Sequence, residues 1–139
     1  MSARFDREVA IVTGGAGGIG SATCRKLVAE GARVVVADID PAGAQAVADE
    51  IGATAIAFDL GKPDEVERLI AETVDGLGRL DVLVNNAALR TPEAMAADTT
   101  IETMDVDGWR EMMDVTRSAS RLPASTRSRT CGRPGAARS

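Results

Sequence analysis

The sequence contains no histidine and no tyrosine, and its aromatic residues are limited to two phenylalanines and one tryptophan. Without histidine, these 139 residues can form neither a Ser-His-Asp triad nor a histidine-ligated metal site. Without tyrosine, no phenolic group can act as a catalytic acid or base. The composition therefore excludes several common kinds of catalysis before any motif is considered.

Cysteine is also scarce. Cys24 and Cys131 are the only two, which gives neither a disulfide framework nor a metal-binding spacing. We expect Cys24 to be a reduced, small core residue on a helix. No apolar run approaches membrane-spanning length, and the sequence opens without the long apolar region of a signal peptide. These features predict a cytoplasmic protein with no membrane partner.

Acidic residues are missing from the last part of the chain. Residues 115–139 contain six arginines and no aspartate or glutamate, although the whole chain has a net charge of −5. Residues 116–139 also lack apolar periodicity, so we expect a disordered tail that follows a single incomplete domain, residues 1–115. A cationic tail can bind nucleic acid, but this one has no lysine or aromatic residue, and we do not expect such a partner.

Short apolar runs alternate with amphipathic stretches in the first part of the chain, and glycine or proline separates them. We expect strands at residues 8–13, 32–39, 53–60 and 80–88, and helices at residues 19–30, 41–51 and 62–78. This alternation predicts an α/β fold, the first half of a Rossmann-like doubly wound parallel sheet. Right-handed crossovers give its four strands the order 3-2-1-4.

A long polar loop is expected after the fourth strand, and the start of a further helix after that loop. In this helix Trp109, Met112 and Met113 are predicted to face inward.

Glycines are concentrated between the first strand and the first helix, in the stretch "TGGAGGIG". Glycines at a helix N-terminus let backbone amides approach a pyrophosphate closely. Two spacings fit: Gly15, Gly17 and Gly20 match G-x-G-x-x-G, whereas T-G-x-x-x-G-x-G is matched by Thr13, Gly14, Gly18 and Gly20. A merely flexible turn and the S-adenosylmethionine loop of a methyltransferase remain alternatives.

Acidic residues at the ends of the next two strands narrow the choice of ligand for the glycine stretch. Asp38 stands where a carboxylate accepts hydrogen bonds from the ribose hydroxyls of adenosine, and it would repel a 2′-phosphate. No arginine or lysine lies in the glycine stretch or directly after Asp38, which favours NAD over NADP. Asp59 can accept from an adenine amino group while Leu60 packs near the ring. The alternatives are a solvated acid at Asp38 and a helix cap at Asp59.

Asn85 and Asn86 end the fourth strand and are followed by two alanines. These residues suit a place where backbone passes close to a ligand while the amide side chains tie neighbouring strands together. An ordinary turn is the alternative.

Together, "TGGAGGIG", Asp38, "DL" at Asp59 and "LDVLVNNAA" resemble the short-chain dehydrogenase/reductase family over about residues 6–115. The family motifs T-G-x-x-x-G-x-G and N-N-A-G decide for the second glycine spacing, and Ala88 replaces the usual last glycine. The family reaction is reversible hydride transfer between a nicotinamide and an alcohol or carbonyl substrate. The resemblance implies an NAD site made of Thr13, Gly14, Gly17, Gly18, Ile19, Gly20, Asp38, Ile39, Asp59, Leu60, Asn86, Ala87 and Ala88.

The catalytic residues of that family are not found in the sequence. The family uses a Tyr four residues before a Lys, a Ser and a helix Asn, whereas this chain has no Tyr, its last lysine is Lys62, and Thr116 stands where the Asn is expected. We expect no catalytic residue in this chain, which is about half the usual family length. A single-base deletion or sequencing error after Val115 would explain the arginine-rich tail.

Two functions follow from these expectations. The first is the NAD-binding half of a short-chain dehydrogenase, inactive as given, whose small alcohol or carbonyl substrate the sequence does not identify. The second is a non-catalytic module that binds NAD or another adenosine nucleotide. The fourth strand would be an uncovered sheet edge, and family oligomers rely largely on the helix that breaks off at Val115, so a homo-oligomer is not assumed.

Overall fold

The computed structural model describes residues 3–88, 106–108, 110 and 113. Seven elements alternate along residues 3–88, and the four strands form one parallel sheet in the order β3-β2-β1-β4. The elements are β1 (Val9–Thr13), α1 (Gly18–Ala29), β2 (Arg33–Asp38), α2 (Pro41–Ile51), β3 (Thr54–Ala57), α3 (Pro63–Leu77) and β4 (Val82–Val84). This order confirms the α/β prediction and the predicted sheet topology.

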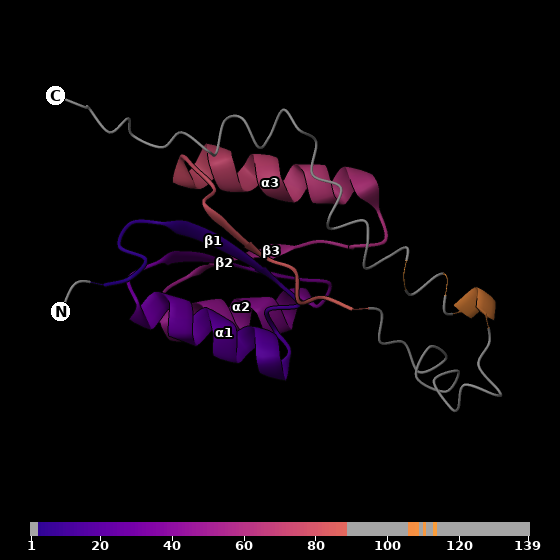
Figure 1. Cartoon of the computed structure of the whole chain (residues 1–139), viewed down its shortest axis with the longest axis horizontal. Coiled ribbons are helices and arrows are strands. Elements are labelled where there is room, and N and C mark those ends of the chain that lie inside the picture. Colours follow the sequence, from indigo (N-terminus) through magenta and orange to yellow (C-terminus); the bar gives the residue numbers. More distant parts are fainter. Residues whose placement is uncertain (1–2, 89–105, 109, 111–112, 114–139) are drawn as a thin grey trace, which may run out of the picture.

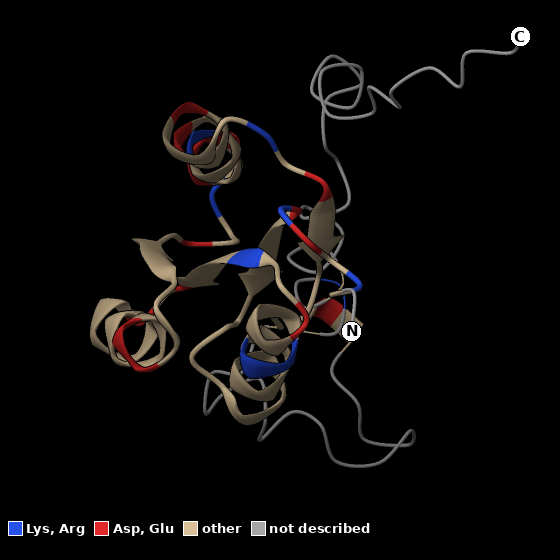
Figure 2. Cartoon of the chain, turned by 90° about the vertical axis from the view of Figure 1, so that its left-hand side faces the viewer, with Lys and Arg blue, Asp and Glu red and all other residues tan. Residues whose placement is uncertain are grey.

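The sheet lies between two layers of helices, with α1 and α2 on one face and α3 on the other (Figure 1). β1 is buried at all five positions, as expected of a central strand covered on both faces. Its alternate side chains serve two cores: Ala10 and Val12 pack with α1 and α2, whereas Ile11 packs with Leu69 and Ile70 of α3. The strands carry charged residues only at the two ends of β2 (Figure 2).

Local sequence signals set the ends of α2 and α3. Asp40 caps α2 by accepting a hydrogen bond from the Ala42 amide at 3.2 Å. Gly52 and Gly78 end the two helices at φ +67° and +84°, in the left-handed region that glycine enters without strain. The predicted bounds of α2 are therefore confirmed.

The third and fourth strands are shorter than the apolar runs predicted. Phe58 still donates its amide to the Asp38 carbonyl at 3.0 Å, but the Asp59 amide turns to the Glu65 carboxylate and leaves the sheet. Asp59 and Leu60 consequently lie in the loop after β3, and Asn85 and Asn86 follow the end of β4.

Residues 106–108, 110 and 113 are helical, as predicted, but Met113 is 40% exposed and does not face inward. Trp109, Met112 and the segment 116–139 lie outside the described residues, so the expectations for them and the division at Val115 stay predictions. Among the helices that the structure describes, none is long and apolar enough to cross a membrane.

Cys24 lies on α1, is fully buried and carries a free thiol, so the expectation of a small core residue is confirmed. Burial raises the pKa of this thiol to about 11, which keeps it protonated at neutral pH.

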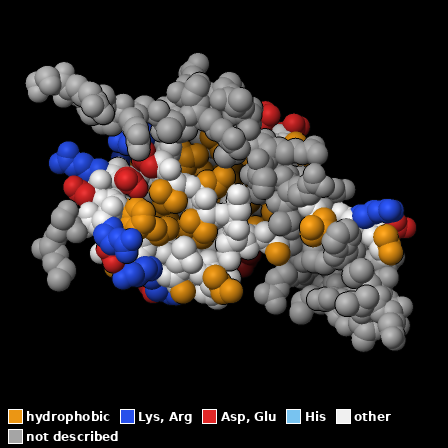
Figure 3. Space-filling view, in the orientation of Figure 1, with side chains coloured by type: hydrophobic (Ala, Val, Ile, Leu, Met, Phe, Trp, Pro, Cys, Tyr) orange, Lys and Arg blue, Asp and Glu red, His pale blue; other side chains and the backbone are white. Residues whose placement is uncertain are grey.

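β4 stands at the edge of the described sheet, where no described strand pairs with its outer side. Hydrophobic side chains gather at this edge, between α3 and the helices of the opposite layer (Figure 3). Asp81 fixes the start of β4 against β1: its carboxylate accepts from the Val9 amide at 2.9 Å, and its own amide donates to the Val9 carbonyl at 2.9 Å. The Arg79 Nε donates to the same carboxylate at 2.9 Å.

The charge of Asp81 adds to stability in a defined pH range. Burial alone raises the pKa of Asp81, but the hydrogen bonds from Arg79 and the Val9 amide outweigh it and hold that pKa below its usual range. The contribution is therefore complete above the unfolded-state pKa of about 3.9 and is lost as the pH falls through the folded-state pKa.

We expect Asp81→Asn to lower the free energy of unfolding by about 1 kcal/mol at pH 7. The difference from wild type should shrink as the pH falls below about 4. Urea unfolding followed by circular dichroism from pH 7 downward measures both effects. Glu67→Gln, the same change of charge on an exposed residue of α3, should have little effect on the free energy of unfolding. If the loss of unfolding free energy in Asp81→Asn stays the same in acid, the charge of Asp81 does not stabilise the fold.

Candidate functional site

A cavity of about 600 Å³ opens where the carboxyl ends of the strands meet the N-terminus of α1. It is lined by Gly14, Gly17, Gly18, Ile19, Gly20, Asp38, Ile39, Phe58, Asp59, Leu60, Gly61, Asn86, Ala87 and Ala88. Every residue of the predicted binding set lines this cavity except Thr13. In open α/β sheets, ligands bind at this edge of the strands.

The glycine stretch forms a tight loop that leads into α1. Gly14 has φ +66°, and its carbonyl accepts the Gly17 amide at 3.2 Å. A Cβ on Gly20 would lie 2.0 Å from the Gly14 oxygen, so this approach admits no side chain. Gly17 caps α1 without a side-chain hydrogen bond, and the first turn of the helix carries no acidic residue. The helix N-terminus therefore presents backbone amides to the cavity.

Thr13 lies behind this loop and joins β1 to the segment after β4. Its side chain is almost completely buried, and its hydroxyl donates to the Val84 carbonyl at 3.2 Å. The same oxygen accepts from the amides of Asn86 and Ala87, both at 3.0 Å. Thr13 thus positions the loop without lining the cavity.

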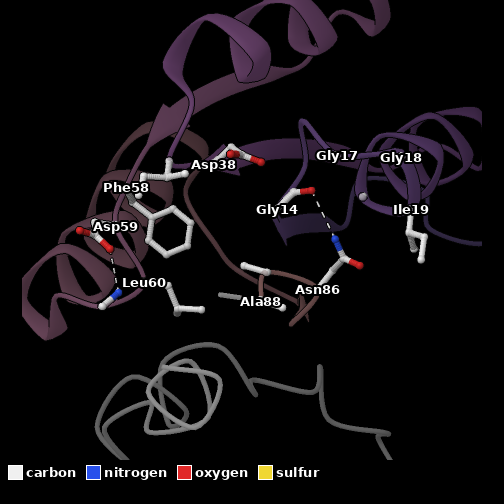
Figure 4. A pocket seen from close by; sticks show the side chains of 14 residues that line it. Gly14, Gly17, Gly18, Ile19, Asp38, Phe58, Asp59, Leu60, Asn86 and Ala88 are labelled. Carbon is white, nitrogen blue, oxygen red and sulfur yellow. Dashed lines mark hydrogen bonds between the residues drawn. The ribbon is translucent and has the colours of Figure 1, made fainter. Parts of the chain in front are cut away.

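The Asn86 side chain makes a second connection to the glycine loop. Its Nδ2 donates to the Gly14 carbonyl at 3.3 Å (Figure 4). The expectation that this amide ties neighbouring strand ends together is confirmed. Ala87 and Ala88 then follow as small residues along the cavity wall.

Asp38 ends β2 beside the glycine loop. One carboxylate oxygen accepts from the Ala16 amide and the other from the Asp40 amide, both at 3.0 Å. The carboxylate is therefore held between the loop and the start of α2, unlike a free strand-end acid in solvent. From this place it faces the cavity (Figure 4).

The loop after β3 forms the opposite wall. The ring of Phe58 lies between Asp38 and Leu60 and faces the glycine loop across the cavity (Figure 4). Phe58 and Leu60 are buried, and the Asp59 carboxylate accepts from the Gly61 amide at 2.9 Å. The residue that caps α3 is Lys62, so the alternative of Asp59 as the helix cap is excluded.

Two residues that shape the cavity or its surroundings, Phe58 and Gly43, were not predicted from the sequence. Phe58 was included in the third strand, and only its position after the strand end places its ring in the cavity wall. A Cβ on Gly43 would lie 2.5 Å from an Asp40 carboxylate oxygen and 3.0 Å from the Ala16 side chain. The signal for Gly43 was present, because it is the one glycine inside the helix-favouring run "PAGAQAVADEI".

Comparison with known proteins decides the family. The model of the family described as short chain dehydrogenase matches residues 8–123, most of the chain. The chain belongs to the short-chain dehydrogenase family. Members of this family are oxidoreductases that bind nicotinamide dinucleotide cofactors and small-molecule substrates. The match continues to residue 123, past the bound of about residue 115 expected for the resemblance, whereas the domain division at Val115 stays a prediction.

Curated short-chain dehydrogenases resemble the chain at moderate identity. Sorbitol dehydrogenase of Cereibacter sphaeroides is 49% identical over 88 residues, which are 62% of this chain and 34% of that protein. L-fucose dehydrogenase of Oryctolagus cuniculus is 38% identical over 114 residues, which are 81% of this chain and 38% of that protein. The chain thus spans less than half the length of these relatives.

Solved structures of the family share the fold. A short chain dehydrogenase from Mycobacterium smegmatis has a TM-score of 0.74 at 32% identity, covering 86% of this chain and 52% of its own. The 3-ketoacyl-(acyl-carrier-protein) reductase of Brucella melitensis, complexed with NADH, has a TM-score of 0.73 at 29% identity, covering 84% and 46%. These similarities confirm the Rossmann-like fold and the family resemblance.

Proposed function

We propose that residues 1–115 are the NAD-binding half of a short-chain dehydrogenase, which transfers hydride between nicotinamide and an alcohol or carbonyl substrate. The observation that carries this proposal is the convergence of the glycine loop, Asp38 and the Asn86 segment on one cavity. As a non-catalytic alternative, the same cavity would serve a nucleotide-binding module. The sequence, which has neither tyrosine nor histidine, fits this alternative as well as an inactive dehydrogenase half.

The residues present fit a dinucleotide pyrophosphate. The close approach at Gly14 and Gly20 leaves no room for a Cβ and puts backbone, not side chains, against a ligand. The N-terminus of α1 adds its partial positive charge. Gly14, Gly17, Gly18, Ile19 and Gly20 would surround the pyrophosphate.

Asp38 supports NAD over NADP. A carboxylate can accept hydrogen bonds from the ribose hydroxyls, but a 2′-phosphate in the same place would be repelled by about 4 kcal/mol at an effective dielectric near 20, before relaxation. No arginine or lysine stands in the loop or directly after Asp38 to offset this repulsion. Ile39, 70% exposed at the cavity rim, would add apolar contact on the adenosine side.

The remaining walls divide between the two ends of the cofactor. Asp59 and Leu60 would contact adenine, and Asn86, Ala87 and Ala88 the ribose on the nicotinamide side. When bound, the cofactor supplies the hydride acceptor or donor, whereas this chain binds and orients it. The given sequence contains no tyrosine, and its last lysine is Lys62, so it does not hold the Tyr and Lys pair with which the family moves the substrate proton.

A titration with NADH and NADPH, followed by nicotinamide fluorescence, tests the proposal on the 139-residue chain. We expect NADH to bind at least about tenfold more tightly than NADPH, and Asp38→Asn to reduce that ratio by removing the repelling charge. Glu67→Gln provides the same loss of charge on exposed α3 and should leave the ratio unchanged.

An alcohol-oxidation assay with NAD should show no turnover, although the fluorescence titration shows binding. A folded chain that binds neither dinucleotide would rule out the cofactor assignment. Turnover by the purified chain would contradict the absence of catalytic residues.

A further inference from the structure

The loop that forms the adenine-side wall is held near its start by side chains from the first two turns of α3. We propose that Glu65 is a positioning residue that fixes this loop, residues 58–61, and thereby sets how Asp59 recognises the adenine amino group. This inference rests on the proposed function. It adds a residue outside the cavity lining to the determinants of cofactor recognition.

Two side chains of α3 anchor the backbone of the loop. The Glu65 Oε2 accepts the Asp59 amide at 2.7 Å, and the Arg68 Nη2 donates to the Ala57 carbonyl at 2.9 Å. Glu65 and Arg68 are themselves 3.7 Å apart, so the two anchors form one charged pair. The backbone at the end of β3 is thereby tied to α3 as well as to the neighbouring strand β2.

The loop also has a fixed edge on the side of the sheet. The Phe58 amide donates to the Asp38 carbonyl at 3.0 Å, whereas the next amide, that of Asp59, goes to Glu65. The Phe58 amide is therefore bound by the sheet, and the next amide along the chain by α3. This places the Phe58 ring in the cavity wall and turns the backbone at Asp59 (Figure 4).

The Asp59 carboxylate depends on this backbone position. Its Oδ1 accepts from the Gly61 amide at 2.9 Å, which leaves Oδ2 to accept from a ligand. The Lys62 ammonium lies 3.7 Å from Oδ2 and 3.3 Å from the Glu65 Oε1. If the backbone at Asp59 moved, its carboxylate would move with it.

Glu65 keeps its negative charge at neutral pH. The hydrogen bond from the Asp59 amide, followed by the hydrogen bond and the charge of Lys62, holds the pKa of Glu65 below its usual range. The side chain is therefore a permanent acceptor under ordinary assay conditions.

Reduced nicotinamide hypoxanthine dinucleotide provides the test, because it carries a carbonyl oxygen in place of the adenine amino group of NADH. We expect wild type to prefer NADH by about tenfold, the effect of one charge-assisted hydrogen bond. Glu65→Asp retains the charge, but its carboxylate is one methylene too short to reach the Asp59 amide, so the preference should fall to near onefold. Glu65→Gln retains the reach and an amide oxygen, so it should keep most of the preference.

Glu67→Asp is the matched control, because it makes the same shortening at an exposed position of α3. Thermal unfolding of each variant verifies that the fold is retained, and the preference ratio reports positioning separately from stability. The inference is overturned if Glu65→Asp keeps the wild-type ratio or if Glu65→Gln loses as much as Glu65→Asp. A wild-type chain that binds neither dinucleotide contradicts the proposed function itself; a wild type that binds both equally overturns only the role of Asp59 and Glu65.

Discussion

Thr13→Val is expected to lower the free energy of unfolding by about 2–3 kcal/mol, although valine has nearly the same shape as threonine. The Thr13 hydroxyl makes three partly buried hydrogen bonds, and valine replaces it with a methyl group. The Asn86 amide keeps a second acceptor, the Val84 carbonyl at 3.1 Å, but the Ala87 amide loses the partner described above. An unsatisfied donor at this place costs more than a hydrogen bond exposed to water.

Thr13→Ser is the matched control, because it restores the hydroxyl and removes only a methyl group. We expect it to lose about 1 kcal/mol. Urea unfolding followed by circular dichroism compares the three proteins. If Thr13→Val and Thr13→Ser lower the free energy of unfolding equally, packing of the methyl group, and not the hydroxyl, matters at Thr13.

Thr13→Val and Thr13→Ser should also differ in their affinity for NADH. Valine releases the segment after β4 from β1, so the Asn86 side chain and the Gly14 carbonyl lose their fixed spacing. We expect Thr13→Val to weaken NADH binding by about tenfold or more, and Thr13→Ser to stay close to wild type.

Gly20→Ala is expected to lower the free energy of unfolding by about 3 kcal/mol and to abolish measurable NADH binding. The added Cβ would stand 2.0 Å from the Gly14 oxygen and 2.9 Å from the Asn86 Nδ2. Both contacts are with groups that shape the loop, and the nearer one is backbone. Relief of the overlap must therefore displace either the glycine loop or the start of α1.

Gly76→Ala makes the same substitution in α3, where the Cβ meets open space. It should raise the free energy of unfolding by up to about 1 kcal/mol and leave NADH binding unchanged. Urea unfolding and the fluorescence titration measure both variants. Wild-type NADH affinity in Gly20→Ala would show that the loop does not need this close approach.

The sequence predicted best where a local signal marks both ends of an element. α2 begins at Pro41 and ends before Gly52 as expected, because its cap, its first-turn proline and its left-handed glycine are all local features. The sheet order followed from the alternation of strands and helices, since right-handed crossovers leave few arrangements for a parallel sheet.

Prediction failed where a buried residue is not in a strand. The run ending in Phe58 and Leu60 is apolar to its end, and apolar character does not distinguish burial within a sheet from burial under a loop. Met113 is exposed for a related reason, because helical periodicity gives a face but does not show whether another element covers it.

The site residues were predicted by motif, but the contacts that hold them required the structure. Thr13 fits the glycine motif, yet its partners follow β4, more than seventy residues away. Glu65 belongs to none of the sequence motifs described above, and its bond to the Asp59 amide depends on where β3 ends. The preference for NAD over NADP stays a prediction from Asp38.

Chemical-shift mapping of the ¹⁵N-labelled chain with NADH tests the central claim most directly, because it asks where the dinucleotide binds. We predict that the largest amide shifts fall on Gly14, Gly17, Gly20, Asp38 and Asn86, and that an equal concentration of NADPH produces smaller shifts at the same amides. Shifts confined to other residues, or none in a chain whose spectrum shows that it is folded, would contradict the account.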